Sequence, residues 1–203
     1  GSYHGKSMGA LSLTFNPKYR EPFQPLVEKV SFSPYGDVNA LQDVVDKDTA
    51  FVILEPIQGE SGIRVPPEGF LQEVRKICDE NDSLLIFDEI QSGLGRTGRM
   101  WASEHWKTVP DIMCLAKGIA GGVPMGVTLV RPDILSVMKK GEHSSTFGGN
   151  PLACAAGTAT LHALTQDGLI ENAKSMGEKF SHGLEELKSK HKIIREVRGK
   201  GLM

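Results

Sequence analysis

Four short apolar runs divide the first two thirds of the chain. They cover residues 51–54, 84–87, 112–116 and 127–130, and a charged residue follows each of the first three. Short apolar runs between polar residues predict buried strands. Between the first two runs, apolar residues recur at helical spacing (Phe70, Leu71, Val74, Ile77 and Cys78). Pro66 and Pro67 are expected to open this helix and residues 79–83 to close it. Buried strands joined by helices favour a mainly parallel α/β sheet.

Two longer helices are predicted near the end of the chain. Asn150 suits a helix cap and Pro151 a first helical turn, and an Ala-rich run continues to about Thr165. Asp167 and Gly168 interrupt it. A second helix with a solvated Lys/Glu-rich face follows, to about residue 191. We therefore expect a large domain over residues 1–165, and a linker helix with the start of a smaller domain over residues 166–203.

Composition narrows the possible partners. The 203 residues hold 23 Lys+Arg and 25 Asp+Glu, a formal net charge of −2 without a basic stripe, so neither nucleic acid nor an anionic membrane is expected to bind. Three widely spaced cysteines fit neither a disulfide framework nor a zinc site. His4 and His143 have no second metal ligand at helical spacing, so we expect both to be structural or supporting residues. No apolar stretch reaches the ~20 residues of a membrane span. We expect a soluble cytoplasmic protein without a metal.

The two ends do not resemble natural termini. The chain begins at Gly1 without an initiator methionine, and its last residues look like a loop entering a strand. We therefore expect a fragment of a longer protein.

Charged residues at the ends of the predicted strands indicate a binding site. Ligands of open α/β sheets bind beyond the carboxyl ends of the strands, where Glu55, Asp88 and Lys117 stand. One such acid is most often a loop cap, whereas three charged residues together favour a site. Desolvation at the end of an apolar strand lowers the pKa of a lysine, which suits an amine that forms a Schiff base. A carboxylate such as that of Asp88 keeps the ring nitrogen of pyridoxal protonated. At about 4 Å and an effective dielectric of about 20, this attraction is about 4 kcal/mol.

Two stretches of the sequence resemble nucleotide-binding motifs and offer other interpretations. Residues 84–89 could form a Walker B strand of an ATPase, with Asp88 near Mg²⁺ and Glu89 polarising water, but no G-x-x-x-x-G-K-[ST] phosphate cradle is present. Residues 93–98 match G-x-G-x-x-G, yet no acid ends a second strand about 20 residues later, as a dinucleotide fingerprint requires. We interpret these glycines as a loop near a cofactor or a neighbouring chain.

Six motifs together resemble the class III (omega) aminotransferases, which depend on pyridoxal phosphate. In chain order they are YHGKSMG at 3–9, EPIQGE at 55–60, FDEIQSG at 87–93, RTG at 96–98, AKG at 116–118 and STFGGNP at 145–151. The chain looks most like the acetylornithine and acetyl-lysine aminotransferases of arginine and lysine biosynthesis. The resemblance implies a fold-type I large domain, with helices on both faces of a mostly parallel seven-stranded sheet, and the start of a small C-terminal α/β domain.

The resemblance also implies roles for individual residues. Lys117 would form the Schiff base with pyridoxal 5'-phosphate, and Asp88 would pair with the ring nitrogen. Gln91 would bond the 3-oxygen of the ring. Ile90 would pack on one ring face and Tyr3, where the family more often has Phe, on the other.

Three further implications concern the partner subunit, the substrate and the phosphate. Thr146 matches the residue that reaches the phosphate of the partner subunit's cofactor, which implies a homodimer with shared active sites. Glu60 matches the glutamate that neutralises a substrate-binding arginine, expected beyond Met203. Ser144 stands where the family usually has Gly, and the amino-terminal turn that holds most of the cofactor phosphate is not among these residues. We therefore expect the fragment to be inactive by itself.

The sequence predicts an aminotransferase that moves a terminal amino group from an acetylornithine-like donor to 2-oxoglutarate. An ornithine or 4-aminobutyrate aminotransferase is the first alternative, and a decarboxylase or racemase of the same fold is another. From different classes, a catalytically silent fragment that serves in assembly and a Walker-B-like ATPase stay open.

Overall fold

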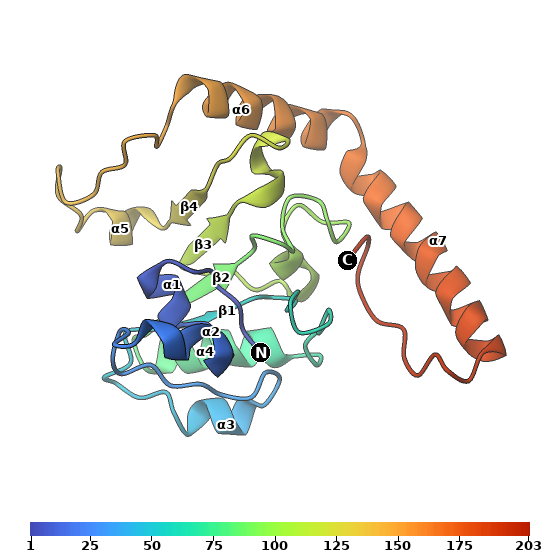
Figure 1. The fold of residues 1–203 in the computed structure, drawn as a ribbon, viewed down its shortest axis with the longest axis horizontal. Helices are drawn as coiled ribbons and strands as arrows, with labels where there is room; N and C mark the ends of the chain where they lie inside the picture. Colours follow the sequence, from blue (N-terminus) through green and yellow to red (C-terminus); the bar gives the residue numbers. More distant parts are fainter.

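A computed structural model describes residues 1–203, with one four-stranded sheet at its centre (Figure 1). The strands are β1 (Phe51–Leu54), β2 (Leu84–Asp88), β3 (Ile112–Leu115) and β4 (Val127–Val130), and they lie in the order β1-β2-β3-β4. The first three are parallel, which confirms the predicted α/β class. The resemblance implies a sheet of seven strands. These residues form four of them.

Strand β4 departs from the expected parallel arrangement. It runs antiparallel to β3, with Ile112 opposite Val130 and Leu115 opposite Val127. The short connection between them holds only the 3-10 helix η3 (Lys117–Ala120), whereas a parallel return needs a crossover of a dozen or more residues. Strand β4 is therefore added as an antiparallel edge.

Helix α4 (Phe70–Glu80) forms the crossover from β1 to β2. It begins at Phe70, three residues after Pro67, and its N-cap is Gly69, whose φ of 80° lies in the left-handed region that glycine tolerates. The prolines therefore precede the helix instead of opening it. Its Leu71, Val74 and Cys78 side chains are fully buried against the sheet, in line with their helical spacing. The core formed there also includes Leu54, Ile57, Leu85, Phe87 and Trp106.

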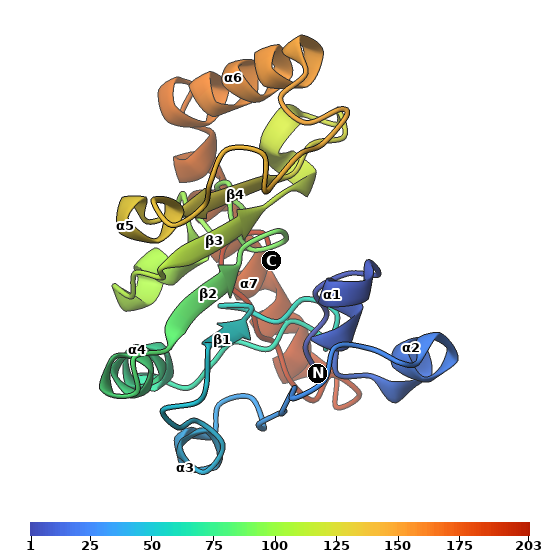
Figure 2. The ribbon, with the colours of Figure 1, turned by 90° about the vertical axis from the view of Figure 1, so that its left-hand side faces the viewer.

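Short helices that the apolar pattern did not predict surround this core. Helices α1 (Met8–Ser12) and α2 (Pro17–Arg20) and the 3-10 helix η1 (Glu21–Phe23) precede α3 (Val38–Gln42). The 3-10 helix η2 (Ala102–Trp106) lies between β2 and β3, and α5 (Pro132–Leu135) follows β4. Figure 2 shows α1 beside the carboxyl ends of β1 and β2, so the amino-terminal segment reaches the edge where the candidate site was predicted.

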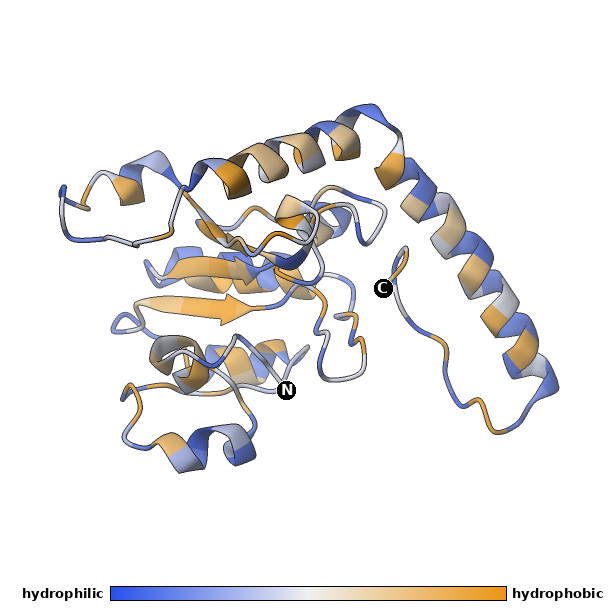
Figure 3. Ribbon diagram, turned by 45° about the horizontal axis from the view of Figure 1, so that its top comes forward, coloured by the Kyte–Doolittle hydropathy of each residue, from blue (hydrophilic) through white to orange (hydrophobic).

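The two predicted long helices are present as α6 (Pro151–Gln166) and α7 (Leu169–Lys190). The Asn150 side chain accepts a hydrogen bond from the Ala153 amide at 2.9 Å, which confirms the predicted cap. Gly168, with a φ of 69°, separates the helices. Figure 3 shows that α6 is largely hydrophobic whereas hydrophilic residues alternate along α7, which extends away from the sheet. Neither is long and apolar enough to cross a membrane, nor is any other helix.

Candidate active site

Asp88 is the last residue of β2, and its side chain is held from two directions. It is 6% exposed. Its Oδ1 accepts a hydrogen bond from the Ile90 amide at 3.0 Å, and its Oδ2 lies 2.8 Å from Nδ1 of His4. The parallel strands therefore place a buried, oriented carboxylate at the sheet edge where ligands of such folds bind.

His4 makes a closer contact with the candidate site than its place in the sequence indicates. We expected a structural or supporting histidine, and the structure assigns it a direct contact with the Asp88 carboxylate. An ionised carboxylate only accepts hydrogen bonds, so Nδ1–H of His4 donates to it. The His4 side chain is 3% exposed, and its Nε2 is buried without a hydrogen-bond partner. Its place beside Tyr3 in the first motif was the only sequence signal, because nothing in the spacing identifies Asp88 as the partner.

Glu55 directly follows β1, and its carboxylate binds backbone amides of two other segments. Its Oε1 accepts a hydrogen bond from the Tyr3 amide at 3.1 Å, and its Oε2 accepts one from the Gly59 amide at 2.9 Å. The carboxyl group is buried, and burial raises its pKa against these two stabilising hydrogen bonds. Glu55 therefore connects the segment that carries Tyr3 to the turn that carries Glu60.

Gln91 packs against the same turn. A Cβ atom built on Gly59 would lie 1.4 Å from Oε1 of Gln91, so only glycine leaves room for that carboxamide. Gln91 and Ile90 are both half-buried, while Glu60, next to Gly59, is exposed. The structure thus brings the second and third motifs together at the end of β2.

Lys117 follows β3 and begins η3. The β2–β3 register places Cys114 opposite Asp88, so Lys117 lies just beyond the same edge of the sheet. Its φ of 47° is unusual for a residue with a side chain, and such backbone strain occurs often at functional sites. The expectation of a desolvated amine is wrong for this chain, because Lys117 and the adjacent Gly118 are exposed.

Thr146 does not join this group within one chain. It is exposed in the loop between α5 and α6, which Figure 1 shows at the edge of the molecule. Among the predicted site residues, the structure therefore brings Asp88, Ile90 and Gln91 together at the end of β2. The Tyr3 backbone is held beside them through Glu55, while the Tyr3 ring packs edge-on against Tyr19, with the ring centroids 6.0 Å apart. Lys117 and Glu60 are exposed, and Thr146 lies in a separate loop.

Glu89 has no exposed surface to offer to a water molecule. Its Oε2 accepts hydrogen bonds from Ser92 Oγ at 2.6 Å and the Ala102 amide at 3.0 Å, and its Oε1 accepts one from the Ser103 amide at 2.9 Å. The side chain is fully buried, and burial raises its pKa. Glu89 therefore anchors the loop after β2, and the ATPase alternative loses the residue that would polarise water.

The side chains at this edge fit the pyridoxal ring by their chemistry. Asp88 provides an oriented carboxylate whose two oxygens retain acceptor capacity beyond the contacts with Ile90 and His4. Gln91 adds a carboxamide, Tyr3 an aromatic ring and Lys117 a primary amine. These groups match a protonated ring nitrogen, a phenolic oxygen, a flat ring and an aldehyde, respectively.

Comparison with known proteins agrees with this chemistry. The family described as "Aminotransferase class-III" matches residues 1–203. An acetylornithine aminotransferase from Methanopyrus kandleri is 52% identical over 203 residues, which are 100% of this chain and 51% of that protein. An ornithine aminotransferase structure from Toxoplasma gondii is 40% identical with a TM-score of 0.94, covering 98% of this chain and 48% of that one.

A second structure of that Toxoplasma gondii enzyme is described as showing partial occupancy of pyridoxal phosphate at its active site. It is 40% identical, with a TM-score of 0.93 over 98% of this chain and 47% of that chain. This chain spans about half the length of the curated relatives it matches.

Proposed function

This chain belongs to the class III aminotransferases, and from that premise we propose that it carries the cofactor-handling part of an aminotransferase that uses pyridoxal 5'-phosphate. The observation that carries the proposal is the buried Asp88 carboxylate, oriented by His4 and by the Ile90 amide at the carboxyl end of β2. In this proposal residues 1–165 belong to the cofactor-binding domain, and residues 166–203 form a linker helix and the start of a small C-terminal domain.

Four side chains would hold the cofactor ring. Asp88 would bind the ring nitrogen and keep its proton in place, while Gln91 would donate a hydrogen bond from Nε2 to the ring's 3-oxygen. Tyr3 and Ile90 would cover the two faces of the ring. When bound, pyridoxal phosphate supplies an electron sink for the pair of electrons released at the carbon that bears the amine.

Lys117 would be the catalytic residue. Its Nζ would hold the cofactor at the aldehyde carbon and would also serve as the base that accepts the proton from the amine-bearing carbon of the donor. A base with this task must meet both cofactor and donor, and the exposed position of Lys117 beyond β3 allows this. Its positive φ of 47° is also the kind of backbone strain that occurs often at functional sites.

His4 would act as a positioning residue through Asp88. Its Nδ1–H would donate a hydrogen bond to one lone pair of Oδ2 and so hold the carboxylate in one orientation. The other lone pairs of the carboxylate would then be available to the ring nitrogen. Because the contact is buried on both sides, rotation of Asp88 away from the cofactor would break a hydrogen bond that water cannot replace.

The proposed donor is an acetylornithine-like omega-amine and the proposed acceptor is 2-oxoglutarate, in cytoplasmic arginine or lysine biosynthesis. The 52% sequence identity with the acetylornithine aminotransferase of Methanopyrus kandleri supports this donor. Ornithine is the second candidate, because the Toxoplasma gondii enzyme has nearly the same backbone. Glu60 would neutralise an arginine that otherwise binds the donor carboxylate.

Thr146 supports the proposal of a homodimer with shared active sites. It lies apart from Asp88 in its own chain and its hydroxyl is exposed. A second copy could therefore receive this hydroxyl at its cofactor phosphate, as the family resemblance implies.

The decisive experiment compares steady-state rates of the complete protein with 2-oxoglutarate and four donors: acetylornithine, ornithine, acetyl-lysine and 4-aminobutyrate. We expect the highest kcat/KM with acetylornithine. Borohydride treatment in the presence of pyridoxal phosphate, followed by peptide mass spectrometry, should place the cofactor on Lys117. No transamination with any donor, or labelling of another lysine in place of Lys117, would overturn the proposal.

A further inference from the structure

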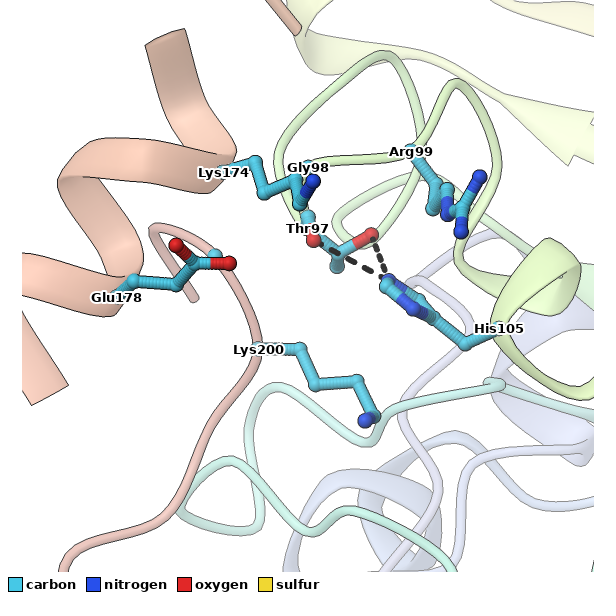
Figure 4. Close-up of a pocket in the computed structure, with 8 residues that line it drawn as sticks. Thr97, Gly98, Arg99, His105, Lys174, Glu178 and Lys200 are labelled. Atoms are coloured by element: carbon cyan, nitrogen blue, oxygen red, sulfur yellow. Dashed lines mark hydrogen bonds between the residues drawn. The ribbon is translucent and has the colours of Figure 1, made fainter. Parts of the chain in front are cut away.

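A polar cavity of about 200 Å³ lies away from the candidate active site, where the loop after β2 meets α7 and the end of the chain (Figure 4). No hydrophobic side chain lines it. Arg99 comes from the loop, Lys174 and Glu178 from α7, and Lys200 from the carboxyl-terminal segment. The remaining lining residues are Thr97, Gly98, His105 and Gly201.

Close backbone packing holds these three segments together. A Cβ on Gly201 would lie 2.4 Å from the carbonyl carbon of Thr97, and a Cβ on Gly177 would lie 2.3 Å from the carbonyl carbon of Gly201. The Leu202 amide donates a hydrogen bond to the Arg96 carbonyl at 2.9 Å. The cavity therefore lies where three distant parts of the chain meet, and close backbone packing between these parts, together with side chains, fixes its walls.

The cavity carries an excess of positive charge. Arg99, Lys174 and Lys200 face only one acid among the lining residues, Glu178, so the walls have a formal charge of +2 with His105 neutral. Lys174 is 3.5 Å from Glu171, whereas Arg99 and Lys200 have no acidic partner within 4 Å. Lys174 therefore has an acidic neighbour, whereas the positive charges of Arg99 and Lys200 are not neutralised by an acidic side chain within 4 Å. Positive charges of this kind on a shared cavity wall favour an anion between them.

His105 lies at the wall of this cavity, near the positive charges of Lys200 and Arg99. Its Nε2 lies 3.1 Å from Oγ1 of Thr97 and 3.2 Å from the Thr97 carbonyl oxygen, which fixes the ring at the wall of the cavity (Figure 4). Burial is the main cause that lowers the pKa of His105, and the nearby charges of Lys200 and Arg99 lower it further, against the opposing effects of the hydrogen bond to the Thr97 backbone and of the Glu104 charge.

We propose that this cavity binds a small, doubly charged oxyanion of the phosphate type, held by Arg99, Lys174 and Lys200. The volume is below the 300–1,000 Å³ or so of pockets for drug-sized ligands and suits a compact anion. Guanidinium and ammonium groups are the side chains that bind phosphate oxygens most strongly. A bound anion would join the loop at residues 97–99 to α7 and to residues 200–201, and so would stabilise the docking of the carboxyl-terminal segment.

Calorimetric titration of the complete protein with inorganic phosphate tests the proposal. Pyridoxal phosphate is kept saturating, so that its own phosphate site is filled, and sodium chloride keeps the ionic strength constant. We expect one saturable phosphate per chain. Lys200→Gln and Arg99→Gln should each weaken its affinity at least about tenfold, the loss expected for one charge-assisted hydrogen bond.

Two controls separate this site from general attraction to positive charge. Lys200→Arg keeps the charge and should keep the binding, and Lys179→Gln removes an exposed lysine of α7 that does not line the cavity. Phosphate should also raise the pKa of His105, followed by NMR, because a nearby anion stabilises the imidazolium. An equal loss in Lys179→Gln, no saturable binding, or an acidic side chain from elsewhere in the protein filling the cavity would overturn the proposal, whatever the result for transamination.

Discussion

The Nδ1 atom of His4 lies 2.8 Å from Oδ2 of Asp88, which joins residues 84 positions apart in the sequence. Both side chains are nearly inaccessible to solvent, 3% and 7% exposed. The contact ties the amino-terminal segment, with Tyr3, to the carboxyl end of β2. It therefore fixes the amino-terminal segment relative to the Asp88 carboxylate.

Asp88→Asn in the complete protein should slow proton removal from the donor by about a thousandfold. This is the effect expected if about 4 kcal/mol of stabilisation of the protonated ring nitrogen is lost. His4→Ala should reduce kcat less, by about tenfold, and His4→Gln, which retains a donor, should restore part of the loss. Single-turnover kinetics and the pH profile of the cofactor absorbance provide the measurements. Normal kinetics in Asp88→Asn would show that the carboxylate is structural.

Lys117→Ala in the complete protein should abolish turnover while noncovalent binding of pyridoxal phosphate persists. Lys107→Ala is the matched control, because Lys107 is also an exposed lysine with a positive φ, 52° against 47° for Lys117. Steady-state rates and equilibrium dialysis of the cofactor distinguish the two variants. More than a few per cent of the wild-type rate in Lys117→Ala would remove this residue from its catalytic role.

Glu60→Ala should change the balance between the two half-reactions. If Glu60 neutralises a substrate-binding arginine, its loss frees that arginine to bind the carboxylate of glutamate. The rate with glutamate as donor should then rise relative to the rate with the omega-amine. Glu68→Ala, another exposed glutamate of the same connection, should leave the ratio unchanged. Equal losses in both half-reactions of Glu60→Ala would indicate a merely supporting role.

Thr146→Val should weaken cofactor binding by about 1.5–3 kcal/mol, the value of a hydrogen bond to a charged group. When this variant is mixed with inactive Lys117→Ala and subunits exchange, both lesions should fall in one site of the heterodimer. The other site is then intact, so activity should return. If exchange is demonstrated and activity stays absent, Thr146 and Lys117 serve the cofactor of the same subunit.

Glu89→Gln should lower the free energy of unfolding by about 1–3 kcal/mol, because an amide nitrogen would face backbone amides that now donate to a carboxylate oxygen. The loss should depend on pH. Burial raises the pKa of Glu89, so the folded state holds its proton where the unfolded chain has released it.

The free energy of unfolding of the wild type should therefore fall as pH rises through this raised pKa. The free energy of unfolding of Glu89→Gln should not respond to this titration, so the gap between the two proteins should narrow. Denaturant unfolding at several pH values, with exposed Glu28→Gln as control, measures both effects. A difference that does not change with pH would contradict the assignment of this titration to Glu89.

Local pattern in the sequence was enough for much of the architecture. The apolar runs coincide with the four strands, and the residues of α4 at helical spacing are those that it buries. The cap at Asn150 and the break at Gly168 were also predictable. Each of these features depends on residues within a few positions of one another, because strand and helix periodicity and capping are local properties of the backbone.

The sequence motifs likewise determined the family and the chemical types present at the site. Only the tertiary structure decided which of these residues are in contact. His4 contacts Asp88, and Gln91 packs against Gly59. Glu89 is buried and binds backbone amides, so it does not activate water. It also decided that β4 is antiparallel and that Lys117 is exposed. Those outcomes depend on contacts between distant segments, where steric fit and the satisfaction of buried polar groups select one arrangement among many that share the same local pattern.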